Sequence, residues 1–227
     1  MNKLTDQQII KSWKNNVKPW VEAIDQAQIQ SRVEVTNQAI VDVVTQFAPK
    51  SSPKTVMDVG CGEGWLTRAL AHKGMDVLGV DVVPQLLEAA RCKGAGRFKT
   101  IAYEDFSAAV PGEKFDVIVC NFSLLGDESV EHFFKQAHNM INDGGALIVQ
   151  TIHPVVACAD EPYQDGWRAG SWTGFSEQFT DPAPWYFRTM DSWKALFTAN
   201  GLILEKVIEP INPKTKLPAS VIFIGRI

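Results

Sequence analysis

The sequence has few of the residues that build metal centres and disulfide frameworks. Its four cysteines, Cys61, Cys92, Cys120 and Cys158, form no CxxC pair, and its four histidines show no metal-ligand spacing with them. This usage is typical of reduced thiols inside a cell. We therefore expect no disulfide framework and no metal site.

Long apolar runs and a strong excess of charge are absent as well. No stretch reaches the roughly 18 apolar residues that a transmembrane helix needs, so no membrane partner is expected. The opening residues, MNKLTDQQIIKSWKNN, lack the apolar run of a signal peptide, which predicts a cytoplasmic protein. The formal net charge of -4 argues against nucleic acid as a partner, because phosphate binding requires a basic face.

The sequence does contain enough apolar material for a globular core. Hydrophobic residues make up 45% of the 227 residues, and this length suits one domain with additions. Apolar residues at helical spacing predict helices over 5–47, with Pro19 breaking the first helix or starting a second, and a longer helix over about 28–47. The stretch 48–54, APKSSPK, is a linker by composition.

From residue 55 onward, short apolar strands alternate with helices. The helices are expected over 63–74, 84–93, 129–141 and 190–200. The strands are expected over 55–60, 76–81, 98–102, 115–121, 146–151, 202–208 and 220–225. Because these strands are apolar on both faces, they indicate an α/β fold with a Rossmann-like, mostly parallel seven-stranded sheet and helices on both faces.

The segment 153–188 interrupts this alternation after the fifth strand. It is rich in glycine, proline and aromatic residues. Structureless segments longer than about 12–15 residues are generally functional or disordered, and a disordered linker would not be so aromatic. We interpret the segment as a lid over a largely apolar pocket; the alternative is a structural flap or a dimer surface.

These patterns predict one domain over 1–227 with four parts. They are an N-terminal helical cap (1–48), a cofactor-binding core (52–152), the lid insertion (153–188) and the C-terminal part of the core sheet (189–227). A monomer or a homodimer is compatible with this organisation.

The stretch DVGCGEGW (58–65) joins the first strand to the following helix. Gly60 and Gly62 match the dinucleotide fingerprint G-x-G-x-x-G, but its third position is Trp65, and Gly64 comes one residue early. Asp58, at the end of the strand, suits a cation better than a pyrophosphate. Asp81 ends the second strand, where a carboxylate accepts hydrogen bonds from ribose hydroxyls. A ligand with a cationic group for Asp58 and a ribose for Asp81 would suit both carboxylates. S-adenosylmethionine is such a ligand.

At these residues the sequence resembles the class I S-adenosylmethionine-dependent methyltransferases. VMDVGCGEGWLTRAL is similar to their first motif, VLGVDVVPQLLEAAR to their second, and FDVIVCNFSLL and GGALIVQTIHP to their fourth and fifth strand regions. The resemblance extends over about residues 52–225. The SW…N…W start and DPAPWYFRT also resemble a bacterial group of small-molecule methyltransferases, which indicates no particular acceptor.

The resemblance implies a set of cofactor contacts. The glycine turn lies under the methionine part, Asp58 orders the turn near the ammonium, and Asp81 takes the ribose hydroxyls. Asn121 offers its carbonyl to the ammonium or faces the substrate, and Arg32 pairs with the cofactor carboxylate. The family often has an aspartate after the third strand for adenine, where this sequence has Ala102, so Tyr103 and Glu104, or Asp105, are the candidates instead. The predicted cofactor-binding residues are Arg32, Asp58, Gly60, Cys61, Gly62, Gly64, Trp65, Asp81, Val82, Tyr103, Glu104 and Asn121.

The predicted reaction is methyl transfer to the oxygen or nitrogen of a small molecule, with S-adenosylhomocysteine as product. His153, just after the fifth strand, is the candidate general base; the alternative is a histidine that anchors the loop before Pro154. The candidate acceptor-binding residues are Trp13, Asn16, Phe122, Trp167, Trp185, Tyr186 and Arg188. Two other functions remain open: a protein that binds S-adenosylmethionine without catalysis, and a nicotinamide-dependent oxidoreductase.

Overall fold

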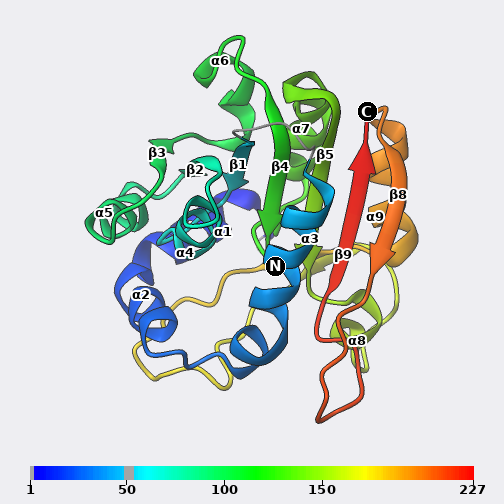
Figure 1. The fold of residues 1–227 in the computed structure, drawn as a ribbon. Helices are drawn as coiled ribbons and strands as arrows, with labels where there is room; N and C mark the ends of the chain where they lie inside the picture. Colours follow the sequence, from blue (N-terminus) through cyan, green and yellow to red (C-terminus); the bar gives the residue numbers. More distant parts are fainter. Residues whose placement is uncertain (1–2, 49–53) are drawn as a thin grey trace.

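A seven-stranded sheet forms the centre of the fold, with strand order β3-β2-β1-β4-β5-β9-β8 (Figure 1). The computed structural model describes residues 3–48 and 54–227, so most of the predicted linker 48–54 lies outside the described residues. The strands are β1 Thr55–Val59, β2 Asp76–Asp81, β3 Arg97–Thr100, β4 Phe115–Asn121, β5 Ile141–Thr151, β8 Ile203–Ile208 and β9 Val221–Arg226. Strands β1 to β5 are parallel, while β9 is antiparallel to both β5 and β8. The predicted mostly parallel sheet is confirmed.

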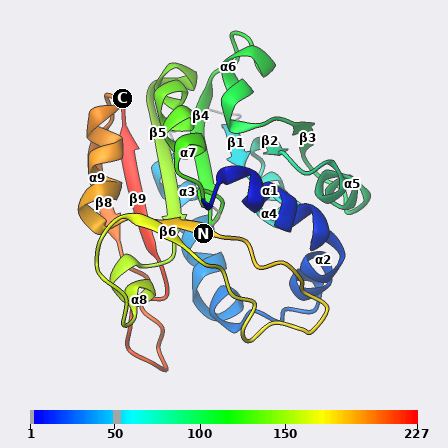
Figure 2. The same cartoon turned by 180° about the vertical axis from the view of Figure 1, so that it is seen from behind.

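Helices cover both faces of this sheet because its central strands are apolar on both sides. On β4, Val117 and Val119 pack towards α3 and α4, while Ile118 and Cys120 pack towards α7 and α9. Figure 2 shows α7 and α9 on the face turned away in Figure 1. The helices are α1 Asp6–Asn15, α2 Val17–Asp25, α3 Asn37–Phe47, α4 Trp65–Ala71, α5 Pro84–Cys92, α6 Phe106–Ala109, α7 Glu128–Ala137, α8 Pro154–Cys158 and α9 Met190–Ala199.

Three segments differ from the sequence-based expectation. The helix expected over 28–47 contains a π-helical stretch, Arg32–Thr36, before α3 begins. Strand β5 begins at Ile141, and its pairing with β4 shifts register near the predicted turn 142–145. The insertion 153–188 was expected to be irregular, but it holds α8 and a two-stranded antiparallel sheet of β6 Gly166–Arg168 and β7 Trp185–Phe187.

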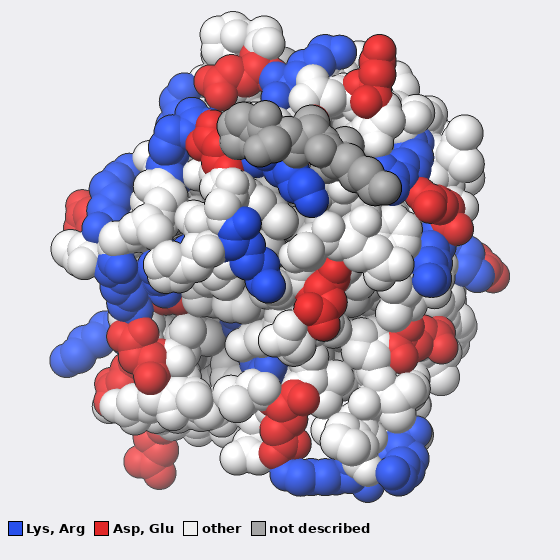
Figure 3. All heavy atoms as spheres, in the orientation of Figure 1, with Lys and Arg blue, Asp and Glu red and all other residues white. Residues whose placement is uncertain are grey.

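One face of the molecule has a mixed charge pattern. On the face shown in Figure 3, basic and acidic side chains are interspersed, with neither sign forming a continuous field. Within the described ranges, no helix is long and apolar enough to cross a membrane. The same part of the chain has no group of three or more His, Cys, Asp or Glu side chains arranged to hold a metal ion.

Candidate cofactor and acceptor site

The glycine turn between β1 and α4 is held against β2 and leaves one position open. The backbone N–H groups of Gly60 and Cys61 donate to the carbonyl oxygen of Val80 at 2.8 and 3.0 Å. A Cβ atom on Gly60 would lie 2.3 Å from the Cβ of Ser123, so packing requires glycine there. A Cβ on Gly62 would meet only Trp20 Nε1, at 3.6 Å. Gly62, with φ of +57°, is therefore the point of the turn where a ligand can approach the backbone.

Asp81 connects this turn to the end of β2. Its Oδ2 accepts from the N–H of Gly62 at 2.9 Å, and its Oδ1 accepts from the N–H of Val83 at 2.8 Å. Burial raises the pKa of the Asp81 carboxyl, and these backbone hydrogen bonds oppose the rise. The carboxylate thus lies beside the open glycine, as a ribose-binding role requires.

Two more carboxyl groups are buried in the turn. Asp58 is 1% exposed and accepts a hydrogen bond from Thr67 Oγ1 at 2.7 Å, and burial raises its pKa to about 7. Glu63 is also buried, which raises its pKa, and it pairs with Arg68 at 3.3 Å. Asp58, Glu63 and Asp81 together make the turn a favourable place for a cation.

Besides Arg68, a second cation, Arg32, interacts electrostatically with this group. Its guanidinium carbon lies 5.2 Å from the ring centroid of Trp65 and 5.4 Å from that of Trp20, and its Nε donates to Asn37 Oδ1 at 3.4 Å. Burial lowers its pKa, while the charges of Glu63 and Asp58 raise it. Arg32 also begins the π-helical stretch, a feature often found at functional sites.

The loop after β4 packs against the glycine turn from the other side. Phe122 adopts a left-handed backbone conformation with φ of +55°, which is strained for a bulky residue and tends to occur at functional sites. The Tyr103 hydroxyl donates to the carbonyl oxygen of Ser123 at 2.9 Å, and Ser123 Oγ donates to that of Val59 at 2.6 Å. The Tyr103 hydroxyl therefore already has a protein partner, while Glu104 is exposed.

A small hollow lies beyond the carboxyl ends of β4 and β5. Its volume is about 10 Å³, which is the room of about one water molecule. It is lined by Leu124, Leu125, Thr151, Ile152, Pro154, Trp185, Tyr186, Phe187, Arg188 and Trp193. Three of the predicted acceptor-binding residues, Trp185, Tyr186 and Arg188, are in this lining. Trp167 packs edge-to-face on Tyr186 behind them, with ring centroids 5.6 Å apart.

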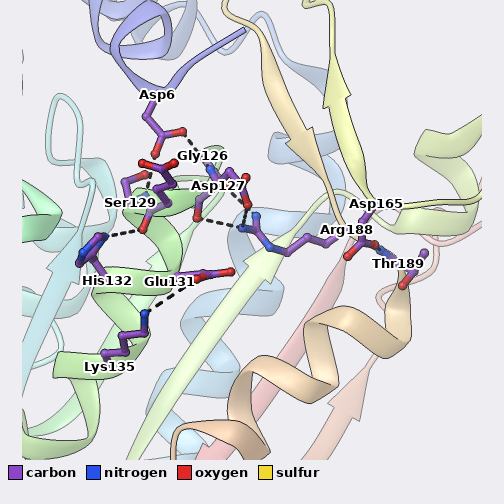
Figure 4. A network of polar contacts seen from close by, with 11 residues as sticks. Asp6, Gly126, Asp127, Ser129, Glu131, His132, Lys135, Asp165, Arg188 and Thr189 are labelled. Atoms are coloured by element: carbon purple, nitrogen blue, oxygen red, sulfur yellow. Dashed lines mark hydrogen bonds and ion pairs between the residues drawn. The ribbon is translucent and has the colours of Figure 1, made fainter. Parts of the chain in front are cut away.

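Arg188 is part of a polar network shown in Figure 4. Its Nη1 donates to the carbonyl oxygen of Gly126 at 2.7 Å, and its Nη2 lies 3.3 Å from Asp127 Oδ1. Asp6 of α1 accepts from the N–H groups of Asp127 and Ser129, at the start of α7. The Arg188 guanidinium thus binds the β4–α7 loop. To bind a carboxylate of the acceptor as well, it would have to divide its N–H donors between that carboxylate and the loop.

The insertion is fastened to the N-terminal helices by Asn16. This side chain is 0% exposed; its Nδ2 donates to the carbonyl oxygen of Thr180 at 2.7 Å, and its Oδ1 accepts from the N–H of Thr180 at 2.8 Å. Trp13 packs edge-to-face on both Trp20 and Trp172 beside this contact. Asn16 and Trp13, predicted to bind the acceptor, do not line the hollow, and in this state they hold the insertion against α1 and α2.

Replacing Asn16 by alanine is expected to loosen the insertion without unfolding the sheet. The change leaves the Thr180 N–H without its partner, at a cost of about 1–3 kcal/mol, while the Thr180 carbonyl oxygen keeps only its hydrogen bond from Trp172 Nε1. Amide hydrogen exchange should become faster over 171–181 and stay unchanged in β1 and β4. Asn15→Ala, which removes only an exposed contact to Asp181 Oδ2, is the control. Equal exchange in the two variants would contradict the fastening role.

His153 is buried beside a carboxylate. It is 6% exposed, and its Nε2 lies 3.1 Å from Oε1 of Glu209, which follows β8. Its Nδ1 is buried and has no hydrogen-bond partner among the described residues. With the Nε2 hydrogen directed at the carboxylate, Nδ1 carries the free lone pair, as a base requires. His153 does not line the hollow, so its catalytic role stays a prediction.

The structure brings Gly62 of the glycine turn and Asp81 of β2 together, and Trp20 lies over the open glycine. It also adds residues that the sequence did not single out: Gln150 contacts Asn121, Glu209 contacts His153, and Thr36 contacts Gln150. Gln150 carried a recognisable signal, since it is a polar residue within an otherwise apolar strand. Glu209 carried none, because only the fold places it beside His153.

Comparison with known proteins identifies the family. Residues 30–207 match the model of a methyltransferase domain. The ubiquinone biosynthesis O-methyltransferase of Xylella fastidiosa (strain 9a5c) is 31% identical over 133 residues, covering 56% of this chain and 53% of that protein. The demethylmenaquinone methyltransferase of Tropheryma whipplei (strain Twist) is 35% identical over 104 residues, covering 44% and 42%. The chain thus spans about half the length of the curated relatives it matches.

Solved structures agree on the fold. The magnesium protoporphyrin IX methyltransferase of Synechocystis PCC 6803, with bound S-adenosylhomocysteine, matches with a TM-score of 0.68 at 16% identity, over 98% of this chain and 100% of that one. An S-adenosylmethionine-dependent methyltransferase from Mesorhizobium loti matches with a TM-score of 0.63 at 19% identity, over 82% and 96%. The chain belongs to the methyltransferase domain family, within class I of the S-adenosylmethionine-dependent methyltransferases, as its motifs predict.

Proposed function

We propose that this protein transfers a methyl group from S-adenosylmethionine to a small-molecule acceptor. The observation that carries the proposal is a group of three carboxyls around the open backbone of Gly62: Asp58 and Glu63 are buried, and Asp81 is half-buried. Such a site favours a cation that also carries hydroxyl donors. S-adenosylmethionine, with a sulfonium, an ammonium and a ribose, fits this donor set.

The proposed contacts follow from where each residue lies. Asp81 accepts hydrogen bonds from the ribose hydroxyls. Asp58 orders the glycine turn near the cationic groups of the cofactor. Arg32, beside Glu63 and Asp58, offers its guanidinium to the cofactor carboxylate. Val82, Tyr103 and Glu104 are the proposed contacts of the adenine ring. Because the Tyr103 hydroxyl is bound to Ser123, we expect its ring rather than its hydroxyl to make this contact.

The acceptor is proposed to bind between the β4 and β5 ends and the insertion. Trp185 and Tyr186 supply aromatic surface there, and the names of the relatives refer to quinone biosynthesis, which supports a ring-bearing acceptor. The bound cofactor supplies an activated methyl group, so the protein has to align the acceptor and exclude water. Alignment can contribute up to about 7–11 kcal/mol. The insertion, fastened to α1 by Asn16, would exclude water, and His153 would accept the proton of a hydroxyl or ammonium acceptor.

Thermal unfolding with added ligands tests the cofactor. A ligand at 100 times its dissociation constant adds about 2.7 kcal/mol to the free energy of unfolding. We expect S-adenosylmethionine and S-adenosylhomocysteine to raise the melting temperature and NAD to leave it unchanged. A shift with NAD alone would indicate an oxidoreductase. A shift with the adenosyl ligands but no methylation of any phenolic or amine acceptor would indicate a protein that binds the cofactor without catalysis.

A further inference from the structure

A buried chain of polar groups lies behind Asn121, at the carboxyl ends of β4 and β5 and the amino end of β9. Its central residue is Gln150, which is 1% exposed. Gln150 Nε2 donates to the carbonyl oxygen of Thr36 at 3.1 Å and to Asn121 Oδ1 at 2.7 Å. Gln150 Oε1 accepts from Ser220 Oγ at 3.3 Å. The π-helical stretch that ends at Thr36 is thereby connected to the end of β4.

This chain fixes which way the Asn121 amide faces. The backbone carbonyl of Thr36 can only accept, so the Gln150 atom that faces it must be the amide nitrogen. The same nitrogen lies 2.7 Å from Asn121, so the Asn121 atom that it meets must be the acceptor, Oδ1. The orientation thus follows from a backbone group rather than from an arbitrary choice between amide rotamers. Asn121 therefore directs its Nδ2 hydrogens away from Gln150.

The outward amide lies where the methyl donor is expected. Strand pairing sets Cys120 beside Val59, so Asn121 is one step further, next to the first glycine of the turn. Asn121 is partly exposed, and within the ranges that the structure describes no acceptor for its Nδ2 hydrogens is found. The strained backbone of Phe122 follows immediately. A donor held in place by a buried network, with no protein acceptor, is a ready site for a ligand lone pair.

We propose that Asn121 Nδ2 donates to the oxygen that receives the methyl group, that Gln150 is its positioning residue, and that the acceptor is a hydroxyl compound rather than an amine. This inference rests on the proposed function. An attacking hydroxyl oxygen has a second lone pair, which can accept from Asn121 while the first forms the bond. The nitrogen of a neutral amine has one lone pair, and a hydrogen bond from Asn121 would occupy the pair that must attack.

The reaction is balanced with the groups present. The oxygen–methyl bond forms as the methyl–sulfur bond breaks, and the electron pair of that bond stays on sulfur, which becomes the neutral thioether of S-adenosylhomocysteine. The hydroxyl proton leaves to water or to the base proposed above. Because the Asn121 hydrogen bond is stronger to an anionic oxygen than to a neutral one, it favours ionisation of the acceptor.

A matched series of ring acceptors tests the inference: catechol, 2-aminophenol and 1,2-phenylenediamine, each with S-adenosylmethionine. Products are identified by mass spectrometry and proton NMR, and binding is followed with 4-nitrocatechol and 4-nitroaniline on the S-adenosylhomocysteine complex. We expect O-methyl products from the first two acceptors, no product from the third, and binding of 4-nitrocatechol in preference to 4-nitroaniline.

Variants separate the role of Asn121 from a structural one. Asn121→Asp replaces the donor by an acceptor and should lower kcat/KM for catechol by about 10- to 100-fold. Gln150→Met should lower kcat more than it raises KM, and should let N-methylated 2-aminophenol appear. Asn139→Asp, an exposed change between α7 and β5, is the control and should behave as wild type.

Cofactor binding is measured in parallel by thermal shift, and failure of the wild type to bind S-adenosylmethionine would refute the proposed function itself. With cofactor binding intact, three results would overturn the inference. The first is N-methylation by the wild type. The second is an unchanged kcat/KM for catechol in the Asn121→Asp enzyme. The third is a wild type that neither methylates a hydroxyl oxygen nor binds 4-nitrocatechol.

Discussion

Replacing Asp81 by alanine is expected to weaken S-adenosylhomocysteine binding by about 100-fold or more. In the proposed site this carboxylate accepts hydrogen bonds from two ribose hydroxyls, and hydrogen bonds to a charged group are worth about 1.5–3 kcal/mol each. It also holds the N–H groups of Gly62 and Val83, so the loss disturbs the backbone at the open position of the turn. Isothermal titration calorimetry measures the change directly.

Two further variants distinguish a lost contact from a damaged fold. Asp81→Asn keeps an oxygen for one of the backbone N–H groups but removes the charge, and should weaken binding by about tenfold. Asp76→Ala, at the exposed start of the same strand, removes a carboxylate that pairs with Arg97 on the surface and should leave affinity unchanged. If Asp81→Ala bound the ligand as well as Asp76→Ala does, Asp81 would not be the ribose partner.

The free energy of unfolding of the ligand-free protein is expected to fall as pH rises from about 4 to 7. Burial raises the pKa of Asp58 from its ordinary value of 3.8 to about 7, so in this range the folded state binds a proton that the unfolded state has lost. The contribution is fully present below pH 4 and is lost as pH approaches 7. A shift of about three pH units corresponds to about 4 kcal/mol.

Urea unfolding at a series of pH values measures this slope. The Asp58→Asn side chain cannot ionise and keeps an oxygen for Thr67. Between about pH 4 and 7, the free energy of unfolding of this variant should therefore fall by about 4 kcal/mol less than that of the wild type. Asp42→Asn, on the exposed side of α3, should keep the wild-type slope. A parallel decline in wild type and Asp58→Asn would show that other carboxyls, such as Glu63, cause it.

The sheet could be predicted from the sequence because its signals are local. Apolar runs such as Phe115–Asn121 identify the strands, and their alternation with helices implies parallel order. The glycine turn and Asp81 could also be found, because their meaning depends only on position at the end of a strand. The solved methyltransferase structures agree with the fold, while the roles of the glycine turn and Asp81 stay predictions.

The contacts that complete the site could not be predicted, because they join residues distant in the chain. Nothing near Gln150 in the sequence indicates Thr36 or Asn121, and nothing near Glu209 indicates His153. The hairpin of β6 and β7 was missed because each strand has only three residues, too few for an alternating pattern to be recognised. The π-helical stretch was missed because its side chains fit an ordinary helical period.

The hydrogen bonds between Asn16 and Thr180 join positions 164 residues apart in the chain. Contacts this distant are slow to form, because a large loop must close before they contribute any stability. We expect the sheet to assemble first and the insertion to dock against α1 last. The reverse step is then a local opening, which needs far less free energy than global unfolding. We expect the ligand to enter and leave by this local opening, which repeats only the final stage of folding.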